Sequence, residues 1–447
     1  MADILVESIS GARGIVGKSM TPELAERYGF ALATFLRGGK LVVGGDSRTS
    51  HDMLKSAAMA GAMAAGCDCI DIGICPTPTV GIAVRDHKAK GAIAITASHN
   101  PVEWNGIKLF NNKGEFLTPT QYAQFRKVLD RKNIPLADWK KVGSASVDEE
   151  AISRHIERVL KLDLLHIRRI KRRKFKVVID CVNGAGSIAG PKLLSELGCR
   201  VLAINSIPNG RFGRKPEPLP QNLTQLKRKV KSEKADVGFA LDPDADRLAI
   251  VSEDGKAIGE EHTLAMALSA VLAVKPGNVV VNLSTSKMCE EVATKFGCKI
   301  FRSKVGEANV VELMRKKRGV AGGEGNGGVI LPKNHYGRDS LVGMALILEH
   351  LANRRATVSA AIKEYPNYIL VKDKGKLTAG FDVKLEKLKR KLDDTRINEL
   401  DGIRIDYPDS WVQIRRSNTE PIYRIFAEAS TSRRAKELIA EIKSLLK

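Results

Sequence analysis

Short apolar segments alternate with longer helical patterns along most of this chain, and this alternation limits the possible folds more than any other feature. A first set contains apolar segments at 40–46 and 91–96, with a helical pattern rich in small residues at 54–66 between them. A second set begins at 176–180 and a third at 278–284. Apolar strands separated by helices are typical of parallel sheets covered by helices. The pattern therefore predicts α/β domains.

The C-terminal part of the chain has a different pattern. From about residue 365 the segments become shorter and more charged, with expected helices and strands at 383–392, 404–407, 423–429 and 432–446. This pattern indicates a smaller α+β domain after three α/β domains. A length of 447 residues agrees with several domains. We place the four domains at residues 1–150, 151–255, 256–365 and 366–447.

The sequence carries few signs of a membrane or secretory context. The longest apolar run covers 263–274 and ends at Lys275, which is shorter than the roughly 18 residues of a membrane helix. The first residues lack the basic and apolar regions of a signal peptide. Cys67 and Cys69 form one CxC pair, and the sequence has no second cysteine pair at the spacing of a zinc site. We therefore interpret the seven cysteines as free thiols. We therefore expect a cytoplasmic protein.

The chain is strongly basic, with a net charge of +22. Such a charge attracts either phosphorylated metabolites or nucleic acid. The densest basic run, at 168–176, lies immediately before an apolar strand, and aromatic residues make up only 5% of the chain. No aromatic residues alternate with the basic runs as a base-stacking surface requires. A nucleic-acid-binding protein is therefore the less favoured alternative.

The first candidate site is the serine loop, residues 96–101, which follows the apolar segment ending at Thr96. Strand ends are where α/β proteins place their ligands. Ser98 is a candidate nucleophile or phosphate carrier, and His99 with the turn's amide groups could orient a phosphate on it. The alternative is a plain turn, because serine, asparagine and proline are ordinary turn residues.

The second candidate site is the aspartate loop, residues 242–247. Its carboxylates Asp242, Asp244 and Asp246 project from one side of an extended backbone. Three such charges repel one another unless a cation neutralises them, and oxygen ligands select Mg²⁺ or Ca²⁺. An EF-hand is an alternative, since Glu253 stands at its twelfth position. Arg247, however, replaces its required glycine, and the flanks resemble strands.

Two further loops offer polar groups to a ligand. The glycine loop, residues 322–328, lets backbone approach a ligand closely and carries Glu324 and Asn326, which suit hydroxyl groups. The arginine loop, residues 415–421, suits a phosphate dianion through Arg415, Ser417, Asn418 and Thr419, with Arg424 just beyond it. A ligand-free turn is the alternative for each. Taken alone, Arg13 and Lys108 are structural or solvated.

Together and in this order, the four loops resemble those of the α-D-phosphohexomutase family, from Arg13 to Arg424. The resemblance implies three related α/β domains and a smaller C-terminal α+β domain around a central cleft. Ser98 would carry phosphate, and Asp242, Asp244 and Asp246 would hold Mg²⁺ with a phosphoserine oxygen. Arg247 would lie beside the phosphoserine. The other implied roles are reacting-centre groups at Arg13, His99 and Lys108, sugar ligands at Glu324 and Asn326, and phosphate ligands at Arg415, Ser417, Asn418, Thr419 and Arg424.

The resemblance also implies a reaction. Ser98 would give its phosphate to a hexose phosphate, forming a bisphosphate that returns its other phosphate to Ser98. The expected partners are a phosphosugar substrate and a sugar bisphosphate activator, and the protein would be a monomer or homodimer. A phosphatase, in which water takes the phosphate, is the alternative enzyme.

The glycine loop departs from the family's common GlyGluxSerGlyHis pattern, because Asn326 replaces the serine and Gly328 the histidine. This variant is usually assigned to phosphoglucosamine mutases. It favours glucosamine 6-phosphate and 1-phosphate as the substrate pair, with a phosphomannomutase/phosphoglucomutase as the alternative. One acid–base candidate is lost with the histidine, so Lys108, His99 or His335 would have to compensate.

Overall fold

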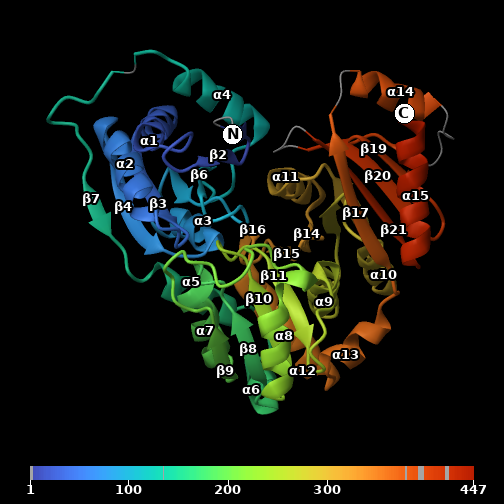
Figure 1. The fold of residues 1–447 in the computed structure, drawn as a ribbon. Coiled ribbons are helices and arrows are strands. Elements are labelled where there is room, and N and C mark those ends of the chain that lie inside the picture. Colours follow the sequence, from blue (N-terminus) through green and yellow to red (C-terminus); the bar gives the residue numbers. More distant parts are fainter. Residues whose placement is uncertain (1–3, 134, 378–379, 391–396, 418–421, 447) are drawn as a thin grey trace.

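The computed structural model describes residues 4–133, 135–377, 380–390, 397–417 and 422–446. They form four sheets with helices, as the sequence predicts. In Figure 1 the first unit (blue) and the last unit (red) lie on opposite sides, and the middle units (green to brown) join them. Where the chain divides between the four domains stays a prediction.

The first unit is a seven-stranded sheet in the order β1-β2-β6-β5-β3-β4-β7. Its elements are β1 (Leu5–Ser8), β2 (Gly11–Ile15), α1 (Pro22–Leu36), β3 (Gly39–Gly45), α2 (His51–Ala64), β4 (Cys67–Ile74), α3 (Thr77–Asp86), β5 (Gly91–Ile95), β6 (Trp104–Phe110), α4 (Pro119–Leu129) and β7 (Ala145–Val147). Strand β3 runs parallel to β4 and β5, so the ends of β3 and β5 meet at one edge.

Helices α1 and α2 cross at glycines. A Cβ on Gly29 would lie 1.9 Å from the carbonyl oxygen of Ala58, and one on Gly61 would lie 2.0 Å from that of Glu26. Backbone therefore contacts backbone at this crossing, because no side chain fits there. This explains the small residues that the sequence places in the second helix.

The second unit is a four-stranded sheet in the order β11-β10-β8-β9. Its elements are α5 (Ala151–Leu160), α6 (Ile167–Arg173), β8 (Lys176–Asp180), α7 (Gly186–Glu196), β9 (Arg200–Ile204), η1 (Pro220–Asn222), α8 (Thr224–Ser232), β10 (Val237–Leu241) and β11 (Leu248–Ser252). Strands β8, β9 and β10 are parallel, whereas β11 returns antiparallel to β10. The aspartate loop is therefore the connection at the end of β10.

The third unit is a five-stranded sheet in the order β13-β12-β14-β15-β16. Its elements are α9 (Glu260–Leu272), β12 (Val279–Asn282), α10 (Met288–Lys295), β13 (Ile300–Ser303), α11 (Glu307–Lys317), β14 (Ala321–Glu324), β15 (Gly328–Leu331), β16 (His335–Arg338), α12 (Ser340–Arg354), α13 (Val358–Ala361) and η2 (Ile362–Glu364). Because Glu324 pairs with Gly328 across β14 and β15, the glycine loop is a tight hairpin.

The last unit is an antiparallel five-stranded sheet in the order β17-β21-β20-β19-β18. Its elements are β17 (Ile369–Lys376), α14 (Phe381–Arg390), β18 (Ile397–Asn398), β19 (Ile403–Asp406), β20 (Trp411–Arg416), β21 (Ile422–Ala429) and α15 (Ser432–Leu445). The smaller α+β domain expected from the sequence is confirmed.

The second and third units share one apolar core, which includes Phe239 of β10, Leu268 of α9 and Leu346 of α12. Helix α9 contains residues 263–272 of the long apolar run, and all of these residues are buried because protein surrounds the helix. No described helix is long and apolar enough to cross a membrane. The first and last units have cores of their own.

Candidate active site

Ser98 lies just beyond the end of β5 in a strained backbone conformation. Its φ of +51° falls in the left-handed region, which non-glycine residues rarely adopt. The residue is almost fully buried, and its backbone N–H donates to Thr96 Oγ1 at 2.8 Å. Such strain persists only where surrounding contacts impose it, and it concentrates at functional sites.

The aspartate loop brings its three carboxylates together at the end of β10. Oxygen atoms of Asp242, Asp244 and Asp246 lie within 4.8 Å of one another, and all three residues are completely buried. The backbone N–H groups of Asp246 and Arg247 donate to Asp242 Oδ1 at 3.1 Å each, which holds the loop in a tight turn. Strands flank this loop on both sides, so the EF-hand alternative is wrong.

These carboxylates fit a hard cation. Asp244 Oδ1 and Asp246 Oδ1 are buried without a hydrogen-bond partner among the described residues, and an unpaired buried carboxylate oxygen is costly. Burial, followed by the charges of Asp244 and Asp246, raises the pKa of Asp242 well above its ordinary value. A divalent ion would satisfy the free oxygens and let all three carboxylates ionise.

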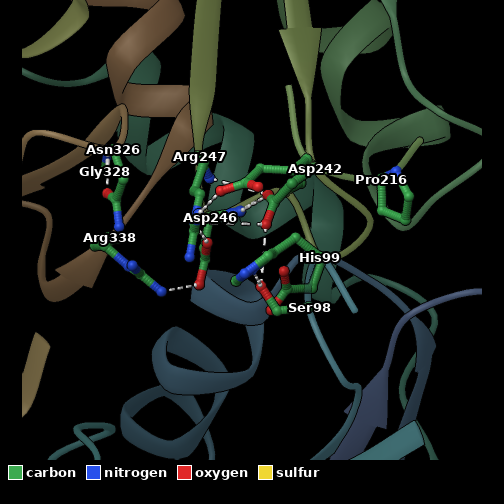
Figure 2. A network of polar contacts seen from close by, with 12 residues as sticks. Ser98, His99, Pro216, Asp242, Asp246, Arg247, Asn326, Gly328 and Arg338 are labelled. Atoms are coloured by element: carbon green, nitrogen blue, oxygen red, sulfur yellow. Dashed lines mark hydrogen bonds and ion pairs between the residues drawn. The ribbon is translucent and has the colours of Figure 1, made fainter. Parts of the chain in front are cut away.

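The serine loop and the aspartate loop meet directly (Figure 2). Ser98 Oγ donates to Asp242 Oδ2 at 3.1 Å, although the two residues are 144 positions apart in the chain. His99 Nδ1 lies 3.4 Å from the same hydroxyl. Burial, and next the charge of Arg247, lower the pKa of His99 well below its ordinary value, so its ring is neutral.

Lys108, on β6, is a cation in direct contact with these carboxylates. Its Nζ donates to Asp244 Oδ2 at 2.6 Å and to Asp246 Oδ2 at 3.4 Å. Thr77 Oγ1 donates to the same oxygen of Asp244 at 2.8 Å. Burial opposes the charge of Lys108, but Asp244 and Asp246 outweigh it and raise the pKa of the ammonium group.

Two arginines stand at the edge of this cluster. Arg13 Nη1, on β2, donates to Asn100 Oδ1 of the serine loop at 3.0 Å. Arg247 Nε lies 4.0 Å from Asp242 Oδ2 and 3.9 Å from Asp246 Oδ1, and it has no hydrogen-bond partner among the described residues. Both guanidinium groups therefore lie close enough to the serine loop and the aspartate loop to attract a phosphate carried by Ser98.

Glu324 is held firmly at the start of the glycine loop. Asn282 Nδ2 and the backbone N–H of Gly306 donate to its Oε1 at 2.7 and 3.0 Å, and Arg338 Nη1 donates to its Oε2 at 2.8 Å. Asn326 Oδ1 accepts the backbone N–H of Gly328 at 3.2 Å, inside the same loop.

The arginine loop is described only in part. Arg415 is buried at the end of β20, and its Nη1 donates to the carbonyl of Arg416 at 3.0 Å. Arg424 Nε donates to Ser417 Oγ at 3.4 Å. Burial lowers the pKa of Arg415, whereas the charges of Asp401 and Glu324 oppose this effect. The predicted ligands Asn418 and Thr419 lie outside the described residues.

Comparison with known proteins agrees with this arrangement of four sheets. The models of phosphoglucomutase/phosphomannomutase α/β/α domains I, II and III match residues 8–133, 153–255 and 260–368. The model of the C-terminal domain matches residues 369–445. The chain belongs to the phosphoglucomutase/phosphomannomutase family. Its members are phosphohexomutases, so this enzyme is an isomerase.

Relatives of this phosphohexomutase cover nearly its whole length. A probable phosphoglucosamine mutase of Methanopyrus kandleri is 37% identical over 98% of this chain and 97% of its own. A phosphoglucomutase/phosphomannomutase of Thermococcus kodakarensis is 38% identical over 96% of this chain and 95% of its own. A crystal structure of a family protein from Burkholderia thailandensis has a TM-score of 0.85 and 27% identity, covering 98% and 96% of the two chains.

His335, one of the residues considered as a replacement for the family's loop histidine, does not suit that role. It lies on β16 against Gly81 and Gly337, and neither ring nitrogen has a hydrogen-bond partner within the described part of the chain. Burial is the main reason that its pKa falls to about 3. Its described neighbours include none of the three aspartates or Ser98, in contrast to Lys108 and His99.

Arg48 was missed in the sequence, although it holds the serine loop of this phosphohexomutase in place. Its guanidinium is buried and donates to four backbone carbonyls at 2.6–2.8 Å, those of Ser98, Asn100, Pro101 and Trp104. Its Nε donates to Asp46 Oδ2 at 3.2 Å, and the same carboxylate oxygen accepts from Thr96 Oγ1 at 2.5 Å. The sequence signal was the AspSerArg tripeptide, residues 46–48, at the end of the apolar segment 40–46.

Proposed function

We propose that this enzyme interconverts 6-phosphate and 1-phosphate hexoses through a phosphate on Ser98. The hydrogen bond between Ser98 Oγ and Asp242 carries this proposal, because it joins a strained, buried serine to three carboxylates that could hold a metal ion. Phosphoryl transfer requires charge neutralisation and in-line positioning. A cation held by the three aspartates, together with Arg247 and Arg13, would supply the charge neutralisation.

The proposed reaction consists of two phosphoryl transfers, and in each the bond that forms and the bond that breaks both involve the same phosphorus atom. In the first, a hydroxyl oxygen of the hexose phosphate bonds to the phosphorus, the bond between the phosphorus and Ser98 Oγ breaks, and the hydroxyl proton ends on Ser98 Oγ. In the second, the other phosphate of the bisphosphate returns to Ser98 by the reverse exchange. The neutral His99 ring, whose Nδ1 lies 3.4 Å from the hydroxyl, can hold the proton in transit. Lys108, a charged ammonium beside Asp244, could supply a proton to a leaving oxygen but not accept one.

Asp242, Asp244 and Asp246 would hold Mg²⁺ together with an oxygen of the phosphate on Ser98. When bound, the ion supplies positive charge beside the phosphoryl oxygens. The chain supplies further charge through Arg247 and Arg13, which lie at the edge of the same cluster. Mg²⁺ is favoured over Ca²⁺ because it binds through few carboxylates together with phosphate oxygens.

We propose glucosamine 6-phosphate and glucosamine 1-phosphate as the preferred pair, with a sugar bisphosphate as activator. Glu324 has two fixed bonds on Oε1 and one on Oε2, which leaves acceptor capacity for an ammonium or hydroxyl group of the sugar. The relative of Methanopyrus kandleri is named a probable phosphoglucosamine mutase, which supports this pair. The relative of Thermococcus kodakarensis is named a phosphoglucomutase/phosphomannomutase, which supports the alternative substrates. One charged hydrogen bond discriminates only by about tenfold to a hundredfold. A cytoplasmic location and a monomer or homodimer stay predictions.

The test of the mechanism combines mass spectrometry with activity. We expect a phosphate on Ser98, loss of nearly all mutase activity in Ser98→Ala, and full activity in the control Ser153→Ala on α5. Chelation should abolish turnover, and Mg²⁺ should restore it. Full activity of Ser98→Ala would refute the phosphoserine mechanism, and net release of inorganic phosphate would favour the phosphatase alternative.

The test of substrate preference measures kcat/KM for glucosamine, glucose and mannose phosphates under one set of conditions. We expect the glucosamine pair to give the highest value, with measurable activity on the others. A glucose or mannose phosphate that exceeds it by about tenfold, or about 1.4 kcal/mol, would overturn this preference and leave the mutase mechanism intact.

A further inference from the structure

Gly328 leaves a space that another side chain fills. A Cβ on Gly328 would lie 2.2 Å from Arg338 Cδ and 2.9 Å from Arg338 Cγ. Arg338, at the end of β16, therefore occupies the volume into which a side chain at position 328 would extend. Figure 2 shows the guanidinium of Arg338 pointing from the glycine loop toward Asp246 of the aspartate loop.

The guanidinium of Arg338 meets three carboxylates from three different segments. Its Nη2 donates to Asp246 Oδ2 at 2.6 Å, and its Nη1 donates to Glu324 Oε2 at 2.8 Å. Its Nε forms an ion pair with Glu307 Oε2, at the first residue of α11, at 2.9 Å. The residue is only 8% exposed, so these interactions act largely out of water.

This geometry requires an arginine. Only a planar guanidinium holds two nitrogens at fixed positions to donate to Glu324 and Asp246 while its Nε stays paired with Glu307, whereas a lysine ammonium is a single point charge on a flexible stem. The Cγ and Cδ atoms cannot move away from position 328 without moving the nitrogens from their carboxylates. Gly328 and Arg338 therefore form a coupled pair.

We propose that Arg338 is a positioning residue for the mutase reaction, which orients Glu324 for the sugar and couples the glycine loop to the aspartate loop through Asp246. Gly328 is required because it leaves room for Arg338. The proposal rests on the proposed function, in which Glu324 binds the sugar and Asp246 binds the metal. It adds a residue that links sugar recognition to the metal site.

The experiment compares Arg338→Met, Arg338→Lys, Gly328→Ala and the double variant Gly328→Ala/Arg338→Met with the parent enzyme. The matched control is Arg315→Met, because Arg315 of α11 also pairs with a carboxylate of another unit, Glu115, away from the reacting cluster. The readouts are kcat and KM for the hexose phosphates, the Mg²⁺ concentration for half-maximal activity, the phosphate content of Ser98, and the denaturation midpoint.

We expect Arg338→Met to lower kcat/KM by about 100-fold, because a small misplacement of reacting groups has effects of that size. Its KM for the sugar and its Mg²⁺ requirement should both rise, whereas Arg315→Met should leave both constants unchanged. The kcat/KM of Arg338→Lys should exceed that of Arg338→Met by about tenfold at most. Gly328→Ala should lose about tenfold, and the double variant should be no worse than Arg338→Met alone.

If the losses of kcat/KM in Gly328→Ala and Arg338→Met add up in the double variant, the two residues are not coupled. Equal effects of Arg338→Met and Arg315→Met would likewise contradict a specific role of Arg338. Retention of kcat/KM within about threefold in Arg338→Met would overturn the positioning role, whereas activity in Ser98→Ala would instead refute the proposed function. If Arg338→Met does not fold, Gly328→Ala and Arg338→Lys still decide the outcome. If Gly328→Ala and Arg338→Lys both keep the KM and the Mg²⁺ requirement of the parent enzyme, the inference is refuted.

Discussion

Replacing Arg48 by methionine removes the group that holds the serine loop. The change keeps much of the side-chain volume but deletes donors to four carbonyls and to Asp46. It leaves the buried Asp46 carboxylate without its ion pair, although Thr96 still donates to it.

The expected loss of stability follows from this burial. Removing one partner of a buried ion pair lowers the free energy of unfolding by about 3–5 kcal/mol. Carbonyl groups left without a donor add to the loss, at about 1–3 kcal/mol each where water cannot reach them. We therefore expect a decrease of about 4 kcal/mol or more. This would be among the largest effects of a single substitution.

The loss of activity has a separate cause. Ser98 keeps its φ of +51° only while its own carbonyl is held by Arg48. Relaxation of this backbone would move Ser98 Oγ away from Asp242, and a misplacement of about 1 Å costs roughly 100-fold in rate. Under conditions where the variant is folded, we expect kcat to fall by that factor.

The assay combines denaturant unfolding, kcat for the hexose phosphates and the phosphate content of Ser98. Arg27→Met is the control in the same unit, since Arg27 of α1 donates to the carbonyl of Leu129 and faces solvent. A change below about 1 kcal/mol in Arg48→Met, together with parental kcat, would refute the argument that these bonds hold the loop.

Three further predictions concern strain, pH and packing. Ser98→Gly should be more stable than Ser98→Ala by about 1 kcal/mol, because only glycine adopts a positive φ freely; equal denaturation midpoints would contradict this. Burial, and next the charge of Glu428, raise the pKa of Glu261 from 4.5 to about 8, so the folded protein keeps a proton that the unfolded chain releases. Stability should therefore fall as pH rises from 4.5 to about 8. The full shift would correspond to about 5 kcal/mol, and because Glu261 is only half-buried we expect solvent screening to reduce it to about 2 kcal/mol. Glu261→Gln should be more stable than the parent by that amount near pH 8.5 and equally stable near pH 4, as unfolding curves at both pH values would show. Gly29→Ala should lower the free energy of unfolding by about 2 kcal/mol, because its Cβ would meet the carbonyl of Ala58, and an unchanged midpoint would show that the helices shift freely.

The sequence by itself determined the fold class and the identity of the loops. Apolar strand segments and turn residues are local signals, so they located the ends of β5 and β10 and the residues Ser98 and Asp242 that follow them. The spacing of the three aspartates likewise indicated a cation site, which the buried triad supports. The smaller C-terminal α+β domain was also visible, because its segments are shorter and more charged.

Only the tertiary structure decided which of these groups touch. Ser98 meets Asp242 across 144 positions, and Arg338 meets Asp246 across 92, so both contacts depend on how separate sheets pack together. The AspSerArg tripeptide is only a weak local signal for Arg48, and no local pattern distinguishes Arg338 from the other arginines of a chain with 73 basic residues. Their roles arise from long-range packing, which encloses each guanidinium with the carbonyls or carboxylates that neutralise it.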